Sequence, residues 1–377
     1  MGGDEVRLDG NTLKLPGGVG VRFIRTLRLP EQGTHGLPPG LGEFPVRRVS
    51  DYADSVPDEW RARGGVMLPM YLREAMWLSF SASEPSALQV GVGKVCAVSG
   101  KPWSDRLGRE PQNYVVLPRQ PWLDGINSGV GTIRQFVAVP MGLGATIEGQ
   151  VTGEEVWGGI QLQTFPLSES ELRAWRASEQ MLKARAITAD SGPIPLGGMP
   201  TGVPPFPPSY GGPIPPPPPA PGSAAGGGQP SGRRLFGQRA PGGAPRRARM
   251  AKAMGLGVGG TMRQEIYQDD RALSVWAATP SGRVFVHLVT PPDWHAITGE
   301  APPPSPVDRR AYTKAGLPWF DYFDSDATDL APAAPLTDVA PVGDWIGADH
   351  EPWQDPTSGQ IHQLGDAPGK PVDDGEW

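Results

Sequence analysis

A stretch of forty residues, 191–230, limits what this chain can fold into, because it cannot contribute to a packed core. It contains fifteen prolines and ten glycines, and it has too few apolar side chains to offset the entropy lost on ordering. The basic segment that follows, up to Lys252, continues this composition. We therefore predict a disordered Pro/Gly/Arg-rich insertion over residues 191–252, in which the proline runs favour extended polyproline II conformations.

The chain on both sides of this insertion is rich in short strand signals. Residues 19–29 alternate apolar and polar side chains with a period of two, which is typical of a half-buried strand. Further β-branched or aromatic runs bounded by turn residues occur at 76–80, 88–98, 114–117, 133–139, 159–165, 261–267, 272–277 and 283–289. Helices are expected at 57–63 and 168–186. The predicted fold class is mainly β, a sandwich or partly open barrel with a few helices.

Charge divides the chain further. Residues 191–260 carry seven basic and no acidic side chains, whereas residues 320–377 carry thirteen acidic side chains and one lysine, so that 1 − 13 gives −12. The tail is also rich in Pro, Ala and Gly, and we predict that it is disordered. The predicted parts are a flexible N-terminus (1–18), a β-rich domain in two pieces (19–190 and 253–329), the insertion (191–252) and the acidic tail (330–377).

The tetrapeptide Met-Gly-Leu-Gly occurs twice, at 141–144 and 254–257. An alignment of the two copies also pairs Glu154-Glu155 with Asp269-Asp270. This pattern suggests two related β-hairpins, with VTGEEVWGG as the turn of the first; chance in a glycine-rich chain is the alternative. The second copy also matches G-x-G-x-x-G, but a basic segment precedes it and a strand-like run follows it, which disfavours a nucleotide site.

The best candidate for a small-ligand site is the glycine-punctuated loop QPWLDGINSGVG. Its Trp122, Asp124 and Asn127 could place an aromatic face and polar groups together, although Asp and Asn also form turns without any ligand. His287 is a further candidate ligand-binding residue. It shares a predicted strand face with apolar side chains, so a core histidine is the alternative interpretation.

An acidic run near the end of the second β-rich piece is a candidate metal site. Asp324, Asp326 and Asp329 supply carboxylates at spacings that resemble part of a calcium loop. Position 329 is Asp where an EF-hand has Gly, and no Glu closes the loop, so a solvated acidic turn is the alternative. We predict no other cofactor. The aromatic residues just before it, beginning at Trp319, are expected to pack on the core.

Several classes of protein are disfavoured by composition. Cys96 is the only cysteine, so no intrachain disulfide can form, and a cytoplasmic location is expected. The first residues lack a signal peptide's apolar core, and no apolar run is long enough for membrane insertion. The net charge of −6 argues against nucleic acid as the partner. We hypothesise instead an intramolecular contact between the basic insertion and the acidic tail, weakened by salt.

Two segments, GQVTGEEVWGG and AGLPWFDYFD, resemble stretches of a group of uncharacterised bacterial and fungal proteins. The resemblance covers roughly residues 19–165 and 254–325. It implies one folded unit with a variable insertion, and it implies no activity and no functional residues.

No nucleophile–base pair, metal-ligand set or cofactor loop stands out in the sequence. The leading functional prediction is therefore a non-catalytic binding or scaffold protein, with an unidentified protein partner or small ligand. The alternative is an enzyme, or a metal- or carbohydrate-binding protein, with a pocket near residues 122–127 and 321–329, because catalytic groups often converge only in the folded chain.

Overall fold

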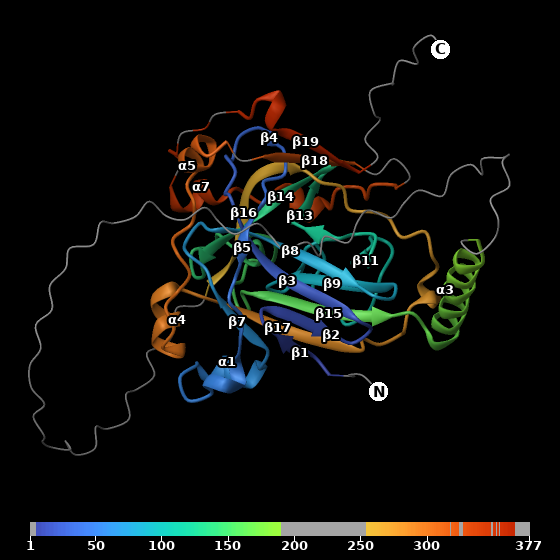
Figure 1. Ribbon diagram of the computed structural model, residues 1–377. Coiled ribbons are helices and arrows are strands. Elements are labelled where there is room, and N and C mark those ends of the chain that lie inside the picture. The colour runs from blue at the N-terminus through green and yellow to red at the C-terminus, as the bar shows by residue number, and fades with distance from the viewer. Residues whose placement is uncertain are drawn as a thin grey trace, which may run out of the picture. The chain divides into compact units, whose positions relative to one another are not determined.

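The computed structural model describes residues 5–189 and 254–365, apart from residues 317, 324–326, 348, 349, 352 and 354. The fold is mainly β, as predicted, with a few helices around one large sheet (Figure 1). The predicted insertion, residues 191–252, lies outside the described residues.

The strands and helices have the following bounds. The strands are β1 (Arg7–Asp9), β2 (Thr12–Leu15), β3 (Val19–Thr26), β4 (Thr34–His35), β5 (Gly40–Glu43), β6 (Arg47–Arg48), β7 (Val66–Pro69), β8 (Ala75–Ala82), β9 (Ser86–Val92), β10 (Val95–Cys96), β11 (Val115–Leu117), β12 (Trp122–Leu123), β13 (Gly125–Gly129), β14 (Thr132–Pro140), β15 (Ile160–Pro166), β16 (Met254–Arg263), β17 (Gly282–Val289), β18 (Trp319–Phe323) and β19 (Ile361–Gly365). The α-helices are α1 (Asp58–Arg63), α2 (Ile147–Thr152), α3 (Glu169–Ala189), α4 (Pro291–Thr298), α5 (Arg309–Lys314), α6 (Ala334–Thr337) and α7 (Val342–Ile346). Three short 3₁₀ turns are η1 (Val49–Tyr52), η2 (Leu273–Val275) and η3 (Ser358–Gln360).

Two runs of strands enclose the main core. One run pairs β2, β3, β8, β14 and β16 in that order, and the other pairs β9, β15, β17 and β7. The runs join where Met254 of β16 pairs with Leu288 of β17. Buried side chains from both runs, such as Phe23, Val90 and Val286, belong to one hydrophobic cluster. The core therefore depends on strands from both sides of residues 190–253.

The outer face of the β9–β15 pair is polar and nevertheless buried. Gln89 and Gln163 lie side by side on this face, and both are almost fully buried. Their amide groups donate to the carbonyl oxygens of Arg106 (2.9 Å) and Ser104 (2.8 Å). The loop after β10 covers this face and shields it from water. Its backbone carbonyls accept the hydrogen bonds that the two glutamine side chains would otherwise make to water.

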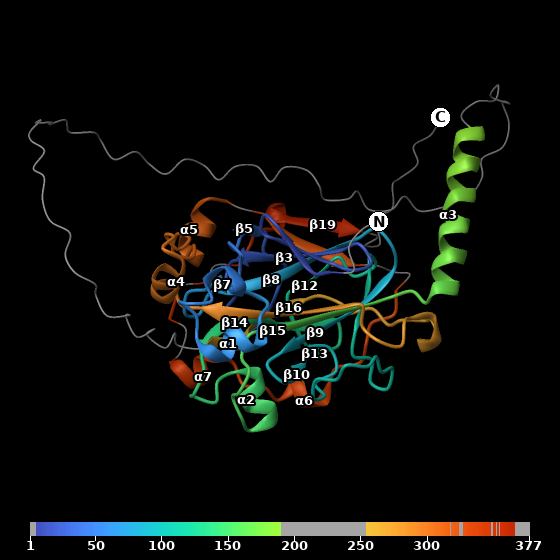
Figure 2. The same ribbon diagram turned by 90° about the horizontal axis from the view of Figure 1, so that it is seen from below.

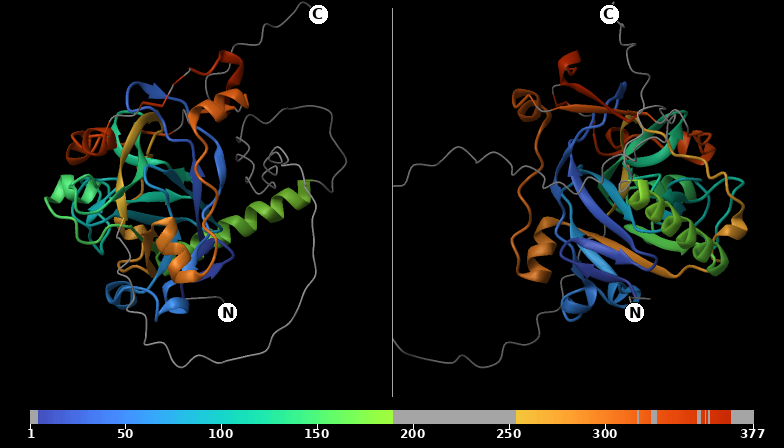
Figure 3. Two further views of the ribbon diagram at one scale, coloured as in Figure 1. Left: turned by 90° about the vertical axis from the view of Figure 1, so that its left-hand side faces the viewer. Right: turned by 45° about the vertical axis from the view of Figure 1, so that its right-hand side comes forward.

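Helix α3 confirms the helix predicted at 168–186 and extends away from the strands (Figure 2 and Figure 3). Leu172 and Trp175 of its first turns pack on a satellite cluster around Tyr114 and Phe165. Further along, Met181 and Leu182 are exposed. No helix among residues 5–189 and 254–365 is long and apolar enough to cross a membrane.

The two Met-Gly-Leu-Gly segments have different structures, so the prediction of two related hairpins is wrong. The first copy, residues 141–144, is a loop whose Gly142 and Gly144 have φ values of 93° and 73°, and it leads into helix α2 rather than a strand. The second copy begins strand β16. A helix begins here because Thr146 caps it by accepting a hydrogen bond from the Gly149 amide at 2.9 Å. VTGEEVWGG therefore forms the end of α2 and the loop after it.

Two strand boundaries after residue 253 also differ from the prediction. Strand β16 occupies residues 254–263, since its glycines lie against neighbouring backbone and side chains where a Cβ would clash. Residues 272–277, predicted as a strand, contain instead the 3₁₀ turn η2. The side chains of this segment are fixed by a buried carboxylate, described below, rather than by a strand ladder.

The chain remains packed beyond residue 330, although its composition predicts a disordered tail from that position. Leu336, Val339 and Val342 are buried, and β19 pairs in parallel with β18. Ala333 and Leu336 belong to the main core cluster. Apolar residues spaced between prolines and alanines supply this packing. The high Pro, Ala and Gly content of the tail as a whole predicts disorder and does not report these single apolar residues.

Candidate functional site

The predicted ligand loop is held by structural contacts. Asp124 is 3% exposed, and its carboxylate accepts a hydrogen bond from the Gln264 amide at 2.8 Å. Burial raises the pKa of Asp124 to about 7, against hydrogen bonds from Gln264 and Trp122 that lower it. Asn127 is also buried and donates to the Ala331 carbonyl at 2.9 Å. The structure thus brings Trp122 and Asp124 together, and Asn127 anchors the C-terminal segment.

His287 lies in a different environment from these three residues. Its ring stacks on Trp60 at 4.6 Å between centroids, and it also contacts the Phe285 ring at 4.5 Å. Its Nε2 hydrogen-bonds to the Gly64 carbonyl at 3.0 Å. Burial lowers the pKa of His287 to about 4, so the imidazole is neutral at physiological pH. These contacts are those of a core histidine, the alternative interpretation of the sequence.

Of the three predicted metal ligands, Asp324 and Asp326 lie outside the described residues. Asp329 closes a loop: its carboxylate accepts from the Gly131 amide at 2.7 Å and from the Ile266 amide at 3.0 Å. Within the described part of the chain, no group of three or more His, Cys, Asp or Glu side chains is arranged to hold a metal ion.

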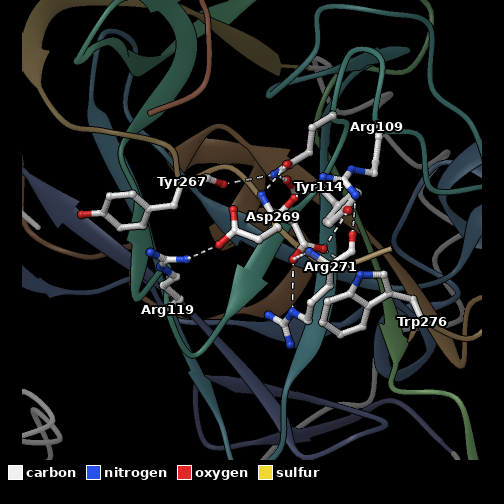
Figure 4. A network of polar contacts seen from close by, with 9 residues as sticks. Arg109, Tyr114, Arg119, Tyr267, Asp269, Arg271 and Trp276 are labelled. Carbon is white, nitrogen blue, oxygen red and sulfur yellow. Dashed lines mark hydrogen bonds and ion pairs between the residues drawn. The ribbon is translucent and has the colours of Figure 1, made fainter. Parts of the chain in front are cut away.

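A second buried carboxylate, Asp269, is the centre of a polar network (Figure 4). One oxygen accepts from the Tyr114 hydroxyl and the Trp276 indole, each at 2.9 Å. The other accepts from the Arg271 side chain at 3.1 Å, while Arg109 donates to the carbonyl of Asp269 at 2.7 Å. Every oxygen of this carboxylate has a partner within the network, which fixes the loop after β16 against β11.

The surface of the protein also carries an open depression, in contrast to the enclosed carboxylates described above. Its volume is about 330 Å³. It is lined by Gly144, Gly149, Gln150, Pro335, Asp338, Val339 and Trp345. The lining comes from the loop before α2, from α2 itself and from the segment that contains α6 and α7, which lie on one side of the strands in Figure 2. Residues almost two hundred positions apart in sequence therefore form one surface.

Gln150 joins the two halves of the depression. Its side-chain amide donates to the Ala340 carbonyl at 3.1 Å, and its side-chain oxygen accepts from the Ala340 amide at 2.6 Å. The same amide group also donates to the Ala145 carbonyl. This two-way contact holds the α6–α7 connection against α2 and fixes the width of the depression.

Glu155 shapes the loop on one wall. Its carboxylate accepts hydrogen bonds from the Gly142 amide, from the Gly144 amide at 3.1 Å, and from the amide and hydroxyl of Thr146 at 3.0 and 2.7 Å. Burial raises the pKa of Glu155, but these donors outweigh burial and hold the pKa below its usual value. The left-handed glycines turn the amides inward, and Leu143 between them is 51% exposed.

Trp345 on α7 is the most conspicuous side chain of the depression. It is 45% exposed and is the one exposed tryptophan among the described residues. Its ring lies against Gly144, where a Cβ would be 3.2 Å from the ring carbons. A flat aromatic face with one donor, left in contact with water, is an energetically favourable surface for a partner.

Arg73, in the turn between β7 and β8, supports the end of α7. Its guanidinium donates to the carbonyl oxygens of Ile346, at 2.7 Å, and Gly347 at the end of the helix. Arg73 has φ of 64° and is the one non-glycine residue with a positive φ in the described chain. This left-handed backbone costs about 1 kcal/mol, and the residue before it, Leu72, is exposed.

The sequence patterns do not predict this surface, because they assign Trp345 to the acidic tail and Gly144 and Gln150 to a hairpin. A signal was present in PVGDWIG, where a proline at 341 precedes a short apolar run suited to a helical turn.

The chain matches no protein-family model, no curated protein and no solved structure.

Proposed function

We propose that this chain is a non-catalytic binding protein and that the depression around Trp345 is its binding surface. The observation that carries the proposal is the exposure of Trp345 over an open depression whose walls are held rigidly by Gln150, Glu155 and Arg73. Rigid support limits the conformational entropy lost on binding, so a pre-formed surface binds more tightly than a mobile one.

The ionisable groups inside the fold support a binding role over a catalytic one. Asp124, Asp269 and His287 are all enclosed by their own partners, and each partner is a structural group of the chain. An enzyme would need substrate to reach such a group. Asp124 is the strongest candidate for an enzyme because of its pKa of about 7, but it is 3% exposed.

Hydrogen–deuterium exchange with a panel of synthetic peptides tests the proposal. The panel contains proline-rich, basic, acidic and amphipathic helical peptides, each with a scrambled control. We expect one class to slow exchange in residues 141–155 and 334–346, and we expect Trp345→Ala to remove this protection.

Leu182→Ala on α3 is the matched control, because this side chain is also exposed but lies on the projecting helix. Protection that survives Trp345→Ala, or that appears only elsewhere on the fold, would contradict the assignment of the depression. Absence of protection by every peptide class would contradict it as well.

A further inference from the structure

We infer that the depression binds a proline- and arginine-rich segment supplied by a second copy of this chain, so that the protein assembles with itself. This inference rests on the proposed function and specifies the partner. It follows from the groups that line the depression and from the exposed carboxylates beside it.

The geometry selects among the common modes of peptide recognition. The walls come from helices and a loop rather than a strand edge, and the amides of Gly142 and Gly144 already donate to Glu155. Strand addition therefore has no ladder to extend. The lining residues decide between the remaining modes, which are a helix laid in a groove and an extended proline-rich peptide.

An extended proline-rich peptide suits the lining. Trp345 offers a flat ring, and Pro335 and Val339 add apolar groups to the lining. Polyproline II segments dock against such aromatic surfaces, because they are already extended and lose little entropy on binding. Proline also lacks an amide hydrogen, so it leaves fewer donors in need of an acceptor than other residues do.

Two exposed carboxylates lie at the depression: Asp338 lines it, and Asp344 precedes Trp345 on α7. The Arg134 and Arg73 guanidinium groups of this region donate to the Val339 and Ile346 carbonyls. Within the described chain no hydrogen bond or ion pair joins Asp338 to another side chain. The arginine guanidinium pairs with a carboxylate and stacks on an aromatic ring at the same time. A peptide that combines proline with arginine therefore matches this surface better than a neutral or acidic one.

The chain itself carries that chemistry. Residues 203–221 contain the run PPFPPSYGGPIPPPPPAP, and residues 233–252 contain six arginines and one lysine without an acidic side chain. The positive charge of the second stretch complements the exposed carboxylates beside the depression. Each copy of the chain thus carries both the depression and a segment that matches it, so that a second copy can serve as the partner.

Sedimentation velocity of the full chain over a range of concentrations tests the inference. We expect self-association that weakens at high salt and that Trp345→Ala weakens at least tenfold, the loss typical of a buried tryptophan at an interface. Asp338→Asn with Asp344→Asn should also weaken association and reduce its salt dependence. Leu182→Ala should leave association unchanged, and an excess of synthetic peptide 203–221 joined to 233–252 should dissociate the assembly.

Three results would overturn the inference: a wild-type chain that stays monomeric at all concentrations, association unaffected by Trp345→Ala, or association insensitive to the competing peptide. The failure of this inference is distinguishable from failure of the proposed function. If the chain is monomeric but another peptide class protects residues 141–155 and 334–346 from exchange, the binding surface stands and the second copy is the wrong partner. Circular dichroism confirms that each variant is folded.

Discussion

Replacing Asp124 by asparagine should make the slope of this protein's stability against pH more positive between pH 4 and 6.5, because the replacement removes a buried titration that opposes the titration of His287. Asp124 has a folded-state pKa of about 7 against an ordinary value of 3.8. Between these values the folded chain holds the proton and the unfolded chain releases it. The stabilisation from Asp124 is therefore complete below pH 3.8 and is lost as the pH rises through 7.

His287 has the opposite effect. Its folded-state pKa is about 4 against an ordinary value of 6.5. Between these values the unfolded chain holds a proton that the folded chain does not. Stability from His287 is therefore complete above pH 6.5 and is lost as the pH falls toward 4.

The contributions of Asp124 and His287 nearly cancel each other. One proton of difference changes the free energy of unfolding by about 1.4 kcal/mol per pH unit, with a negative slope from Asp124 and a positive slope from His287. Between pH 4 and 6.5, Asp124→Asn should add a slope of about +1.4 kcal/mol per unit relative to wild type, or about 3 kcal/mol across the window. His287→Gln should add about −1.4 kcal/mol per unit, and the double variant should restore the wild-type slope.

Urea unfolding followed by tryptophan fluorescence at several pH values from 4 to 6.5 measures these slopes. Asparagine keeps the size of Asp124 and an oxygen that can accept from Gln264, so the fold should survive. Asp270→Asn is the control, because that side chain is 77% exposed and should leave the slope unchanged. An Asp124→Asn variant with the wild-type slope would refute the argument, since it would mean that Asp124 does not bind a proton on folding.

Two further substitutions test the loop anchors. Asp269→Ala should lower the free energy of unfolding by about 3–5 kcal/mol, because it leaves the buried donors of Tyr114 and Trp276 without an acceptor. Asp270→Ala should cost less than about 0.5 kcal/mol in the same urea titration, and equal costs for the two would contradict this account. Glu155→Ala should speed amide exchange at Gly144 and Thr146, whereas the exposed neighbour Glu154 can be replaced by alanine without this effect; similar exchange in both variants would show that Glu155 does not hold the loop.

Local patterns in the sequence predicted much of the fold. The alternation at 19–29 became β3, the runs at 76–80 and 283–289 became β8 and β17, and the amphipathic stretch at 168–186 became α3. These elements follow from side-chain periodicity, which neighbouring residues fix. The errors occurred where periodicity is weak, in glycine-rich segments such as 141–144 and 254–257, whose conformation depends on what packs against them.

The candidate site could not be predicted in the same way. Its residues come from stretches far apart in the chain: Gln150 and Ala340, which set the width of the depression, are 190 positions apart. Asp124 and Gln264, which form the buried acid–amide pair, are 140 positions apart. No local pattern reports such contacts, and a single sequence contains no other record of them.

The sequence by itself therefore determined the class of fold and the elements with strong periodicity, because these depend on which side chains alternate along a few residues. Only the tertiary structure decided that Trp345 is exposed, that Asp124 keeps a proton near neutral pH and that His287 does not. Exposure and pKa depend on the surroundings of a side chain, and those surroundings are assembled from strands and helices that the sequence keeps far apart.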